Sequence, residues 1–210
     1  MGQLIQIDHP LVQSYLTVLR DDRTPSPVFR TALRHLTALL LYEATADLEV
    51  SDVEVRTPLA ETHGAVLDSR VALVPILRAG LGMVDPALEL LPEAEVWHLG
   101  YYRDESTLEP VEYYSKLPQG DPVDVALVLD PMLATGGSAL CALRAVARWG
   151  VERIKLLAVI AAPEGVRHVQ GEFARVPIYV AALDSHLDEN GFIVPGLGDA
   201  GDRFFRAHAR

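Results

Sequence analysis

One stretch decides the fold: Val125-Ala-Leu-Val-Leu-Asp130-Pro-Met-Leu-Ala-Thr135-Gly136-Gly137-Ser138. Residues 125–129 form a continuous apolar run, which is typical of a strand buried on both faces, as in a parallel sheet. Residues 138–149 have the pattern of a helix, and the glycine at position 150 is suited to end it. The order of strand, loop and helix therefore predicts an α/β unit.

Outward from this stretch, apolar segments alternate with loops and helices. Strands are predicted at 71–77, 96–101, 125–130, 154–161 and 176–182, with a short β-like segment near 53–56. Residues 9–19 and 27–47 carry apolar side chains at helical spacing. We expect one α/β domain over 1–210, with a mostly parallel twisted sheet and helices on both faces. Its parts are a helical N-terminal arm (1–50), a core sheet (71–182) with a flexible loop (102–122), and a C-terminal segment (183–210).

The loop in the opening stretch has the properties of a phosphate site. Gly136 and Gly137 let backbone N–H groups approach a ligand closely. Thr135 and Ser138 add hydroxyls, and the helix N-terminus adds unpaired N–H groups with a partial positive charge. Asp130 stands at the carboxyl end of the strand, where open α/β sheets bind ligands. The alternative is a tight turn whose glycines serve geometry alone. Neither the nucleoside-triphosphate P-loop nor the dinucleotide fingerprint has this spacing.

Two arginines accompany the predicted strands. Arg78 directly follows the strand at 71–77, and Arg103 opens the polar loop at 102–122. A guanidinium offers five donors in a planar fork that suits phosphate, and a loop that carries an arginine can close over a polyanion. The alternatives for Arg78 are a cap on the sheet edge or a pairing with Asp85, and the alternative for Arg103 is an ordinary solvated charge.

Composition excludes several classes of protein. The net charge of −11 argues against nucleic-acid binding, which needs a basic face. The sequence has no apolar run of about 18 residues and no signal-peptide pattern at its N-terminus, so we expect a cytoplasmic protein with no membrane partner. The single cysteine cannot form an internal disulfide, and the histidines lack metal-ligand spacing.

Together these motifs resemble the phosphoribosyltransferases, and more narrowly the uracil phosphoribosyltransferases. The opening stretch from Asp130 to Ser138 resembles their ribose-phosphate loop, and the similarity runs nearly end to end. The other matching segments are Tyr42-Glu-Ala-Thr-Ala-Asp-Leu48, Pro75-Ile-Leu-Arg-Ala-Gly-Leu-Gly82, Arg103 with Thr107-Leu-Glu-Pro110, Ala161-Ala-Pro-Glu-Gly165 and Ile193-Val-Pro-Gly-Leu-Gly-Asp-Ala-Gly-Asp202.

The resemblance implies a reaction and a set of site residues. Uracil N1 would take the phosphoribosyl group of 5-phosphoribosyl 1-diphosphate (PRPP), giving UMP and diphosphate, with Mg²⁺ carried by PRPP rather than by a protein metal site. Catalytic roles fall to Arg78, Arg103 and Asp130. Uracil contacts in a C-terminal base-binding hood fall to Ile193, Gly198, Asp199 and Ala200. PRPP contacts fall to Arg78, Arg103, Asp130, Pro131, Met132, Leu133, Ala134, Thr135, Gly136, Gly137, Ser138 and Asp199.

The same resemblance implies a homodimer or larger homo-oligomer, and GTP as the allosteric activator known in some members. One position departs from the wider family: relatives with other base specificities have two adjacent acids in the opening motif, whereas Pro131 takes the second place here. Two alternatives remain open, a transferase for another base such as a purine and a non-catalytic RNA-binding regulator. The uracil-type tail argues against the first, and the net charge with the retained Arg78, Arg103 and Asp130 argues against the second.

Overall fold

The computed structural model describes residues 3–103 and 110–207. Its centre is a sheet with the strand order β1-β11-β10-β8-β4-β6-β7. Every neighbouring pair in this order is parallel except β6 with β7, so the expected mostly parallel sheet is confirmed. The strands are β1 (Leu4–Gln6), β4 (Val71–Leu77), β6 (Leu99–Arg103), β7 (Pro110–Ser115), β8 (Val125–Leu129), β10 (Arg153–Ala161) and β11 (Ile178–Leu183), with β5 (Glu95–Val96) beside β4 and β9 (Met132–Leu133) beside β10.

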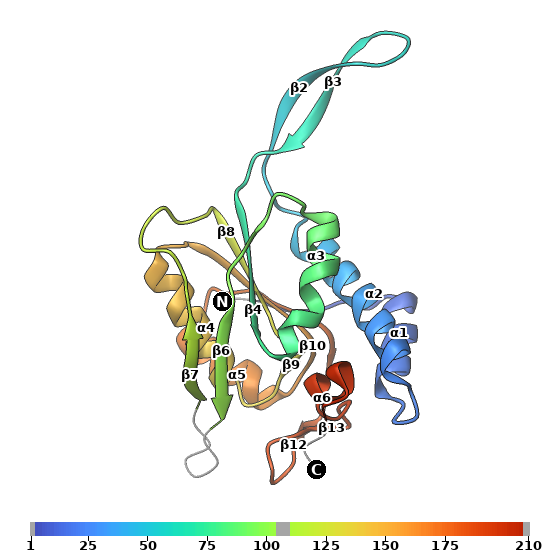
Figure 1. Cartoon of the computed structure of the whole chain (residues 1–210), viewed down its shortest axis with the longest axis vertical. Coiled ribbons are helices and arrows are strands. Elements are labelled where there is room, and N and C mark those ends of the chain that lie inside the picture. The colour runs from blue at the N-terminus through green and yellow to red at the C-terminus, as the bar shows by residue number, and fades with distance from the viewer. Residues whose placement is uncertain (1–2, 104–109, 208–210) are drawn as a thin grey trace.

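Helices cover both faces of the sheet (Figure 1). Strand β8 is buried on both faces, and this explains why its sequence is apolar without alternation. Leu127 and Leu129 face the core built with the N-terminal helices, whereas Ala126 and Val128 face the core built with the later pair. The first group comprises α1 (Pro10–Arg20), α2 (Ser26–Ala44) and α3 (Val84–Leu90), which the short 3-10 helix η1 (Ala79–Met83) precedes; the second comprises α4 (Gly137–Trp149) and α5 (Pro163–Glu172).

Two sequence-based expectations were wrong in part. The single strand expected at 96–101 is two strands, because β5 pairs with the start of β4 and β6 pairs with its end. The irregular loop expected at 102–122 contains β7, which pairs antiparallel with β6. Strand β7 lies at an exposed edge and therefore has no buried apolar run to reveal it. The part of that loop at 104–109 lies outside the described residues.

A β-hairpin and a C-terminal lobe extend from this body. Strands β2 (Val50–Arg56) and β3 (Glu61–Leu67) form an antiparallel hairpin that projects away from the sheet (Figure 1). The sequence had indicated only the short segment near 53–56. The lobe, which follows β11, consists of β12 (His186–Leu187), β13 (Ile193–Val194) and α6 (Ala200–Phe205). Among the described residues, no helix combines the length and the apolar character needed to span a membrane.

Candidate active site

A cleft of about 310 Å³ lies at the carboxyl ends of β4 and β8. It brings together four segments that are far apart in the sequence: the end of β4 with the loop after it, Tyr101 of β6, the loop after β8 with the start of α4, and the C-terminal lobe. Its lining comprises Ile76, Leu77, Arg78, Ala79, Tyr101, Asp130, Met132, Leu133, Ala134, Thr135, Gly136, Gly137, Ser138, Ala139, Gly191 and Asp199. The cleft therefore contains all nine residues of the Asp130–Ser138 stretch except the buried Pro131.

The N-terminus of α4 opens into this cleft. Gly136 precedes the helix with a left-handed backbone (φ 84°), which glycine adopts without steric cost. No side chain of the described residues caps the helix, and its first turn carries no acidic residue. The first-turn N–H groups and the hydroxyls of Thr135 and Ser138 are therefore available to an anion.

The backbone of this phosphate loop (residues 130–138) is held from behind by β10 and α5. The carbonyl oxygen of Pro131 accepts hydrogen bonds from the N–H groups of Val159 (3.0 Å) and Ile160 (3.1 Å). Nδ1 of His168 lies 2.9 Å from the carbonyl oxygen of Thr135. Gly165 packs so closely that an added Cβ would lie 2.3 Å from the carbonyl oxygen of Ala134. Pro131 thus ties the loop to β10 through its carbonyl oxygen.

Asp130 is the acidic residue of the phosphate loop. Burial raises the pKa of its carboxyl group to about 7; the backbone N–H of Met132, which donates at 3.3 Å, opposes this shift, and the negative charge of Asp199 adds to it. A carboxylate in this position accepts hydrogen bonds, so hydroxyl donors of a ligand would favour its ionised form.

Arg78 links the loop after β4 to the C-terminal lobe. Its Nη2 atom lies 3.1 Å from Oδ1 of Asp202 in α6, so its acidic partner is Asp202 rather than Asp85. The N–H of Asp202 in turn donates to Oδ1 of Asp199 at 2.8 Å. Because the Arg78 side chain is 58% exposed, its guanidinium retains donors that can face a ligand in the cleft.

The structure places the other expected residues unevenly. Asp199 lines the cleft, whereas the side chains of Ile193 and Ala200 are buried in the core and Gly198 lies at the surface with φ 75°. The backbone of Arg103 lies at the carboxyl end of β6, next to β4. The position of the Arg103 side chain, and residues 104–109 of the loop 102–122 that was expected to close over the ligand, lie outside what the structure describes.

Sequence reasoning gave no site role to six residues that line the cleft: Ile76, Leu77, Ala79, Tyr101, Ala139 and Gly191. Tyr101, which was given no chemical role, lines it and donates a hydrogen bond to Oε2 of Glu112 at 3.3 Å; burial raises the pKa of its hydroxyl above the usual range. Its place at the end of a predicted strand was a signal that could have found it. Gly191, in the turn between β12 and β13, had no such signal.

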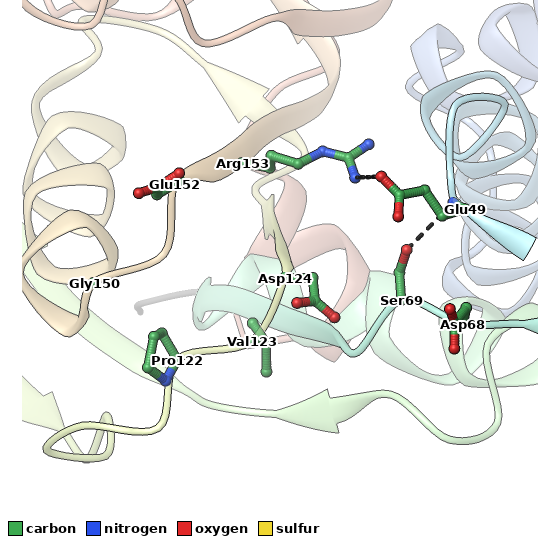
Figure 2. A pocket seen from close by; sticks show the side chains of 9 residues that line it. All are labelled: Glu49, Asp68, Ser69, Pro122, Val123, Asp124, Gly150, Glu152 and Arg153. Atoms are coloured by element: carbon green, nitrogen blue, oxygen red, sulfur yellow. Dashed lines mark hydrogen bonds and ion pairs between the residues drawn. The ribbon is translucent and has the colours of Figure 1, made fainter.

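A larger cavity of about 520 Å³ lies at the opposite, amino ends of β8 and β10 (Figure 2). One arginine, Arg153, stands there beside Glu49 at 3.7 Å. Four carboxylates line the cavity and would repel a polyanion: Glu49, Asp68, Asp124 and Glu152. Within residues 3–103 and 110–207, no three His, Cys, Asp or Glu side chains group in a way that could hold a metal ion.

Comparisons with known proteins agree with this geometry. The family model for uracil phosphoribosyltransferase matches residues 6–207. The chain is 58% identical to a protein of that name from Roseiflexus sp. (strain RS-1) over 98% of this chain and 99% of the relative. It is 50% identical to another from Bacillus thuringiensis (strain Al Hakam), again over 98% and 99%.

Solved structures support the same assignment. The AQ2163 protein from Aquifex aeolicus superposes with a TM-score of 0.92 at 37% identity, over 99% of this chain and 100% of that one. An adenine phosphoribosyltransferase from Thermoanaerobacter pseudethanolicus shares the fold alone, with a TM-score of 0.57 at 13% identity over 82% and 99% of the two chains. From its sequence motifs, its cleft and these similarities, the chain belongs to the uracil phosphoribosyltransferase family.

Proposed function

We propose that this chain transfers the phosphoribosyl group of PRPP to N1 of uracil, giving UMP and diphosphate for pyrimidine salvage. The observation that carries the proposal is the cleft itself. There the uncapped N-terminus of α4, the guanidinium of Arg78 and the carboxylate of Asp199 lie together, in a chain of this family. An anion-binding loop beside the cationic guanidinium of Arg78 suits a substrate with phosphates at both ends.

In this proposal each end of PRPP has its own contacts. The 5-phosphate lies on the backbone and hydroxyls of residues 134–138, supported by Met132, Leu133 and the Pro131 turn. Asp130 accepts hydrogen bonds from the ribose hydroxyls. Arg78 and Arg103 stabilise the diphosphate. Placing both ends of the donor fixes its anomeric carbon beside the base, which is the main requirement of a reaction governed by orientation.

The reaction breaks the bond from C1 of the ribose to the diphosphate oxygen and forms a bond from C1 to uracil N1. The bonding electrons leave with diphosphate, uracil N1 supplies the new pair, and the N1 proton is released to solvent. Donors aimed at the leaving group stabilise the developing negative charge. Mg²⁺, which enters with PRPP, supplies further charge neutralisation. The carboxylates of Asp130 and Asp199 are oxygen groups of the kind that hold Mg²⁺ through water.

Uracil would be recognised by backbone groups of the base loop (residues 193–200), around Ile193 and from Gly198 to Ala200. The edge of uracil alternates acceptor, donor and acceptor, and backbone C=O and N–H groups can match it. Cytosine has an amino group in place of O4, so a facing amide N–H would be left unpaired. A buried unpaired donor costs about 1–3 kcal/mol. Cytosine should therefore be a poor substrate.

One assay tests this function against its alternatives. The purified protein is supplied with PRPP, Mg²⁺ and one base at a time: uracil, cytosine, adenine, guanine or hypoxanthine. Formation of UMP alone is the expected result. A purine nucleotide as the main product would assign a different base. If no base gives a nucleotide and a separate measurement shows that the protein binds RNA, the protein is a regulator.

Three further properties belong to the same proposal. We propose a homo-oligomer, supported by the exposed apolar side chains of the β2–β3 hairpin, among which Leu59 is 96% exposed. Sedimentation should give a mass of at least a dimer.

We also propose activation by GTP, supported by the resemblance to members that GTP activates, so added GTP should raise the rate of UMP formation. Finally, we propose a cytoplasmic location, which cell fractionation tests.

A further inference from the structure

An ion pair joins the N-terminal arm to the chain just before the base loop. Arg20 is the last residue of α1, and Asp184 directly follows β11. The pair is bidentate, with Nη1 2.9 Å from Oδ2 and Nη2 2.5 Å from Oδ1. The side chain of Asp184 is 3% exposed and that of Arg20 is 24% exposed. This geometry fixes both side chains more firmly than an exposed pair would.

Both members of the pair also hold Gly196, in the middle of the base loop. Oδ2 of Asp184 accepts the backbone N–H of Gly196 at 2.9 Å, and Nη1 of Arg20 donates to its carbonyl oxygen at 2.7 Å. Gly196 has φ 63°, and an added Cβ would lie 2.0 Å from the carbonyl oxygen of Ile193. The two polar groups of one tightly turned residue are therefore bound by one ion pair.

Gly196 stands between the residues to which uracil contacts are assigned. Ile193 lies three residues before it, and Asp199, which lines the cleft, lies three residues after it. Backbone recognition of a small planar base needs N–H and C=O groups fixed in direction, since hydrogen bonds weaken steeply when misaligned. A displacement of Gly196 would carry both halves of the loop with it.

We propose that Arg20 and Asp184 are positioning residues for the base: they fix Gly196, and through it the backbone groups that read uracil. This inference rests on the proposed function, because it is that function which assigns the base to this loop. It makes α1, at the opposite end of the chain, a part of base selection. Removing Arg20 would leave the buried carboxylate of Asp184 without its cation, and removing Asp184 would leave the partly exposed guanidinium of Arg20 without its acidic partner, so the loop would have to rearrange.

A second bidentate pair in the molecule supplies a matched control. Arg144 and Glu172 join α4 to α5 with distances of 2.7 and 2.5 Å, and their side chains are 50% and 41% exposed. The hydrogen bonds between them connect two helix surfaces and involve no residue of the base loop. Comparable substitutions in the two pairs therefore separate an effect on the loop from the general effect of losing an ion pair.

The test compares Arg20→Lys and Asp184→Asn with Arg144→Lys and Glu172→Gln. For each variant, kcat and the KM values for uracil and PRPP are measured, together with the ratio of kcat/KM for uracil to that for cytosine. Lysine keeps the charge but cannot span Asp184 and Gly196 with a planar fork. We expect the KM for uracil to rise at least tenfold in the first two variants, equivalent to about 1.4 kcal/mol. The KM for PRPP should stay within about twofold, and preference for uracil should fall. The control variants should keep all three values.

Several outcomes would overturn the positioning role. These are an unchanged KM for uracil, equal increases in both KM values, or an unchanged base preference. If Asp184→Asn does not fold, Arg20→Lys decides, because it retains a cation opposite the buried carboxylate. Formation of UMP by the unmodified protein tests the proposed function by itself. Failure there removes both proposals, whereas failure in the variants alone removes only this one.

Discussion

The phosphate loop and the base loop meet in one cleft, yet they are held in different ways. The phosphate loop runs from β8 directly into α4, and it is supported by the backbone of β10 and by Gly165 and the side chain of His168 in α5. The base loop is held chiefly by the side chains of Arg20, Asp184 and Arg203. Backbone contacts therefore dominate in the first loop and side-chain contacts in the second. Substitutions should affect PRPP binding in the first and base selection in the second.

The largest effect on turnover is expected at Arg78, which lies outside both loops but lines the same cleft. The Arg78→Ala variant should lose about 10²–10³ in kcat, since in the proposed mechanism it removes a donor to the departing diphosphate. The fold should stay intact because the side chain is largely exposed. Steady-state kinetics with thermal unfolding check both parts. Arg34→Ala is the control, since Arg34 pairs with Glu89 in an exposed ion pair. Near-normal turnover of the Arg78 variant would show that the diphosphate does not depend on it.

The next effect should be confined to the phosphate loop. In Gly165→Ala the new Cβ would meet backbone atoms of Ala134, which cannot move aside easily. Overpacking of this kind costs about 1–3 kcal/mol. If the loop bears that strain, the KM for PRPP should rise about ten- to hundredfold.

The control for this variant lies on the same helix. Gly171 has open space around its Cβ position, so Gly171→Ala should stabilise α5 by about 0.5–1 kcal/mol and leave the KM for PRPP unchanged. Equal effects of the two alanine substitutions on the KM for PRPP would contradict the close packing as the cause.

A third substitution acts on the base loop. Arg203 donates to the carbonyl oxygens of Leu197 (2.7 Å) and Asp21 (2.6 Å), and its guanidinium carbon lies 4.5 Å from the ring centre of Phe29. Arg203→Met keeps the aliphatic length but leaves these carbonyls without a donor, which costs about 1–3 kcal/mol in unfolding free energy. The KM for uracil should rise about fivefold, with little change for PRPP. A larger change for PRPP than for uracil would show that the two loops are not held independently.

A further prediction concerns the pH dependence of stability at Asp130. Because burial raises its pKa to about 7, the folded protein binds this proton more tightly than the unfolded chain. The resulting stability is fully present below the ordinary pKa of 3.8 and is lost as the pH rises through about 7. Asp130→Asn should remove this decline, so the Tm difference between variant and wild type should shift in favour of the variant from pH 4 to 7. A Tm difference independent of pH in that range would argue against the raised pKa.

The sequence predicted the strand, the turn and the helix start around residues 130–138 well because the residues that mark them are consecutive. An apolar strand, a terminal acid, two glycines and a helix start all lie within the stretch from Val125 to Ser138. Strand β4 was predicted with its observed ends, Val71 and Leu77, for the same reason: a fully buried strand reads as an unbroken apolar run.

Contacts between distant residues could not be predicted in this way. Nothing local to Arg20 indicates Asp184, and nothing local to Arg78 distinguishes Asp202 from Asp85. The exposed strand β7 and the hairpin β2–β3 were missed wholly or in part, because an exposed strand has no need of the apolar pattern that marks a buried one. The base-binding role was assigned to residues 193–200 only by resemblance, since the glycines there indicate unusual dihedrals but no particular ligand.

The parallel pairing of β1 with β11 also has a consequence for folding kinetics. These strands come from opposite ends of the chain, so their contact closes a very long loop. The chain therefore loses conformational entropy before the new contact contributes any stability. We therefore expect β1 to dock late. Until it does, the apolar strand β11 has an unpaired edge, which is the kind of surface that recruits strands from other chains. Refolding yield should accordingly fall as protein concentration rises, and more steeply still when β1 is weakened.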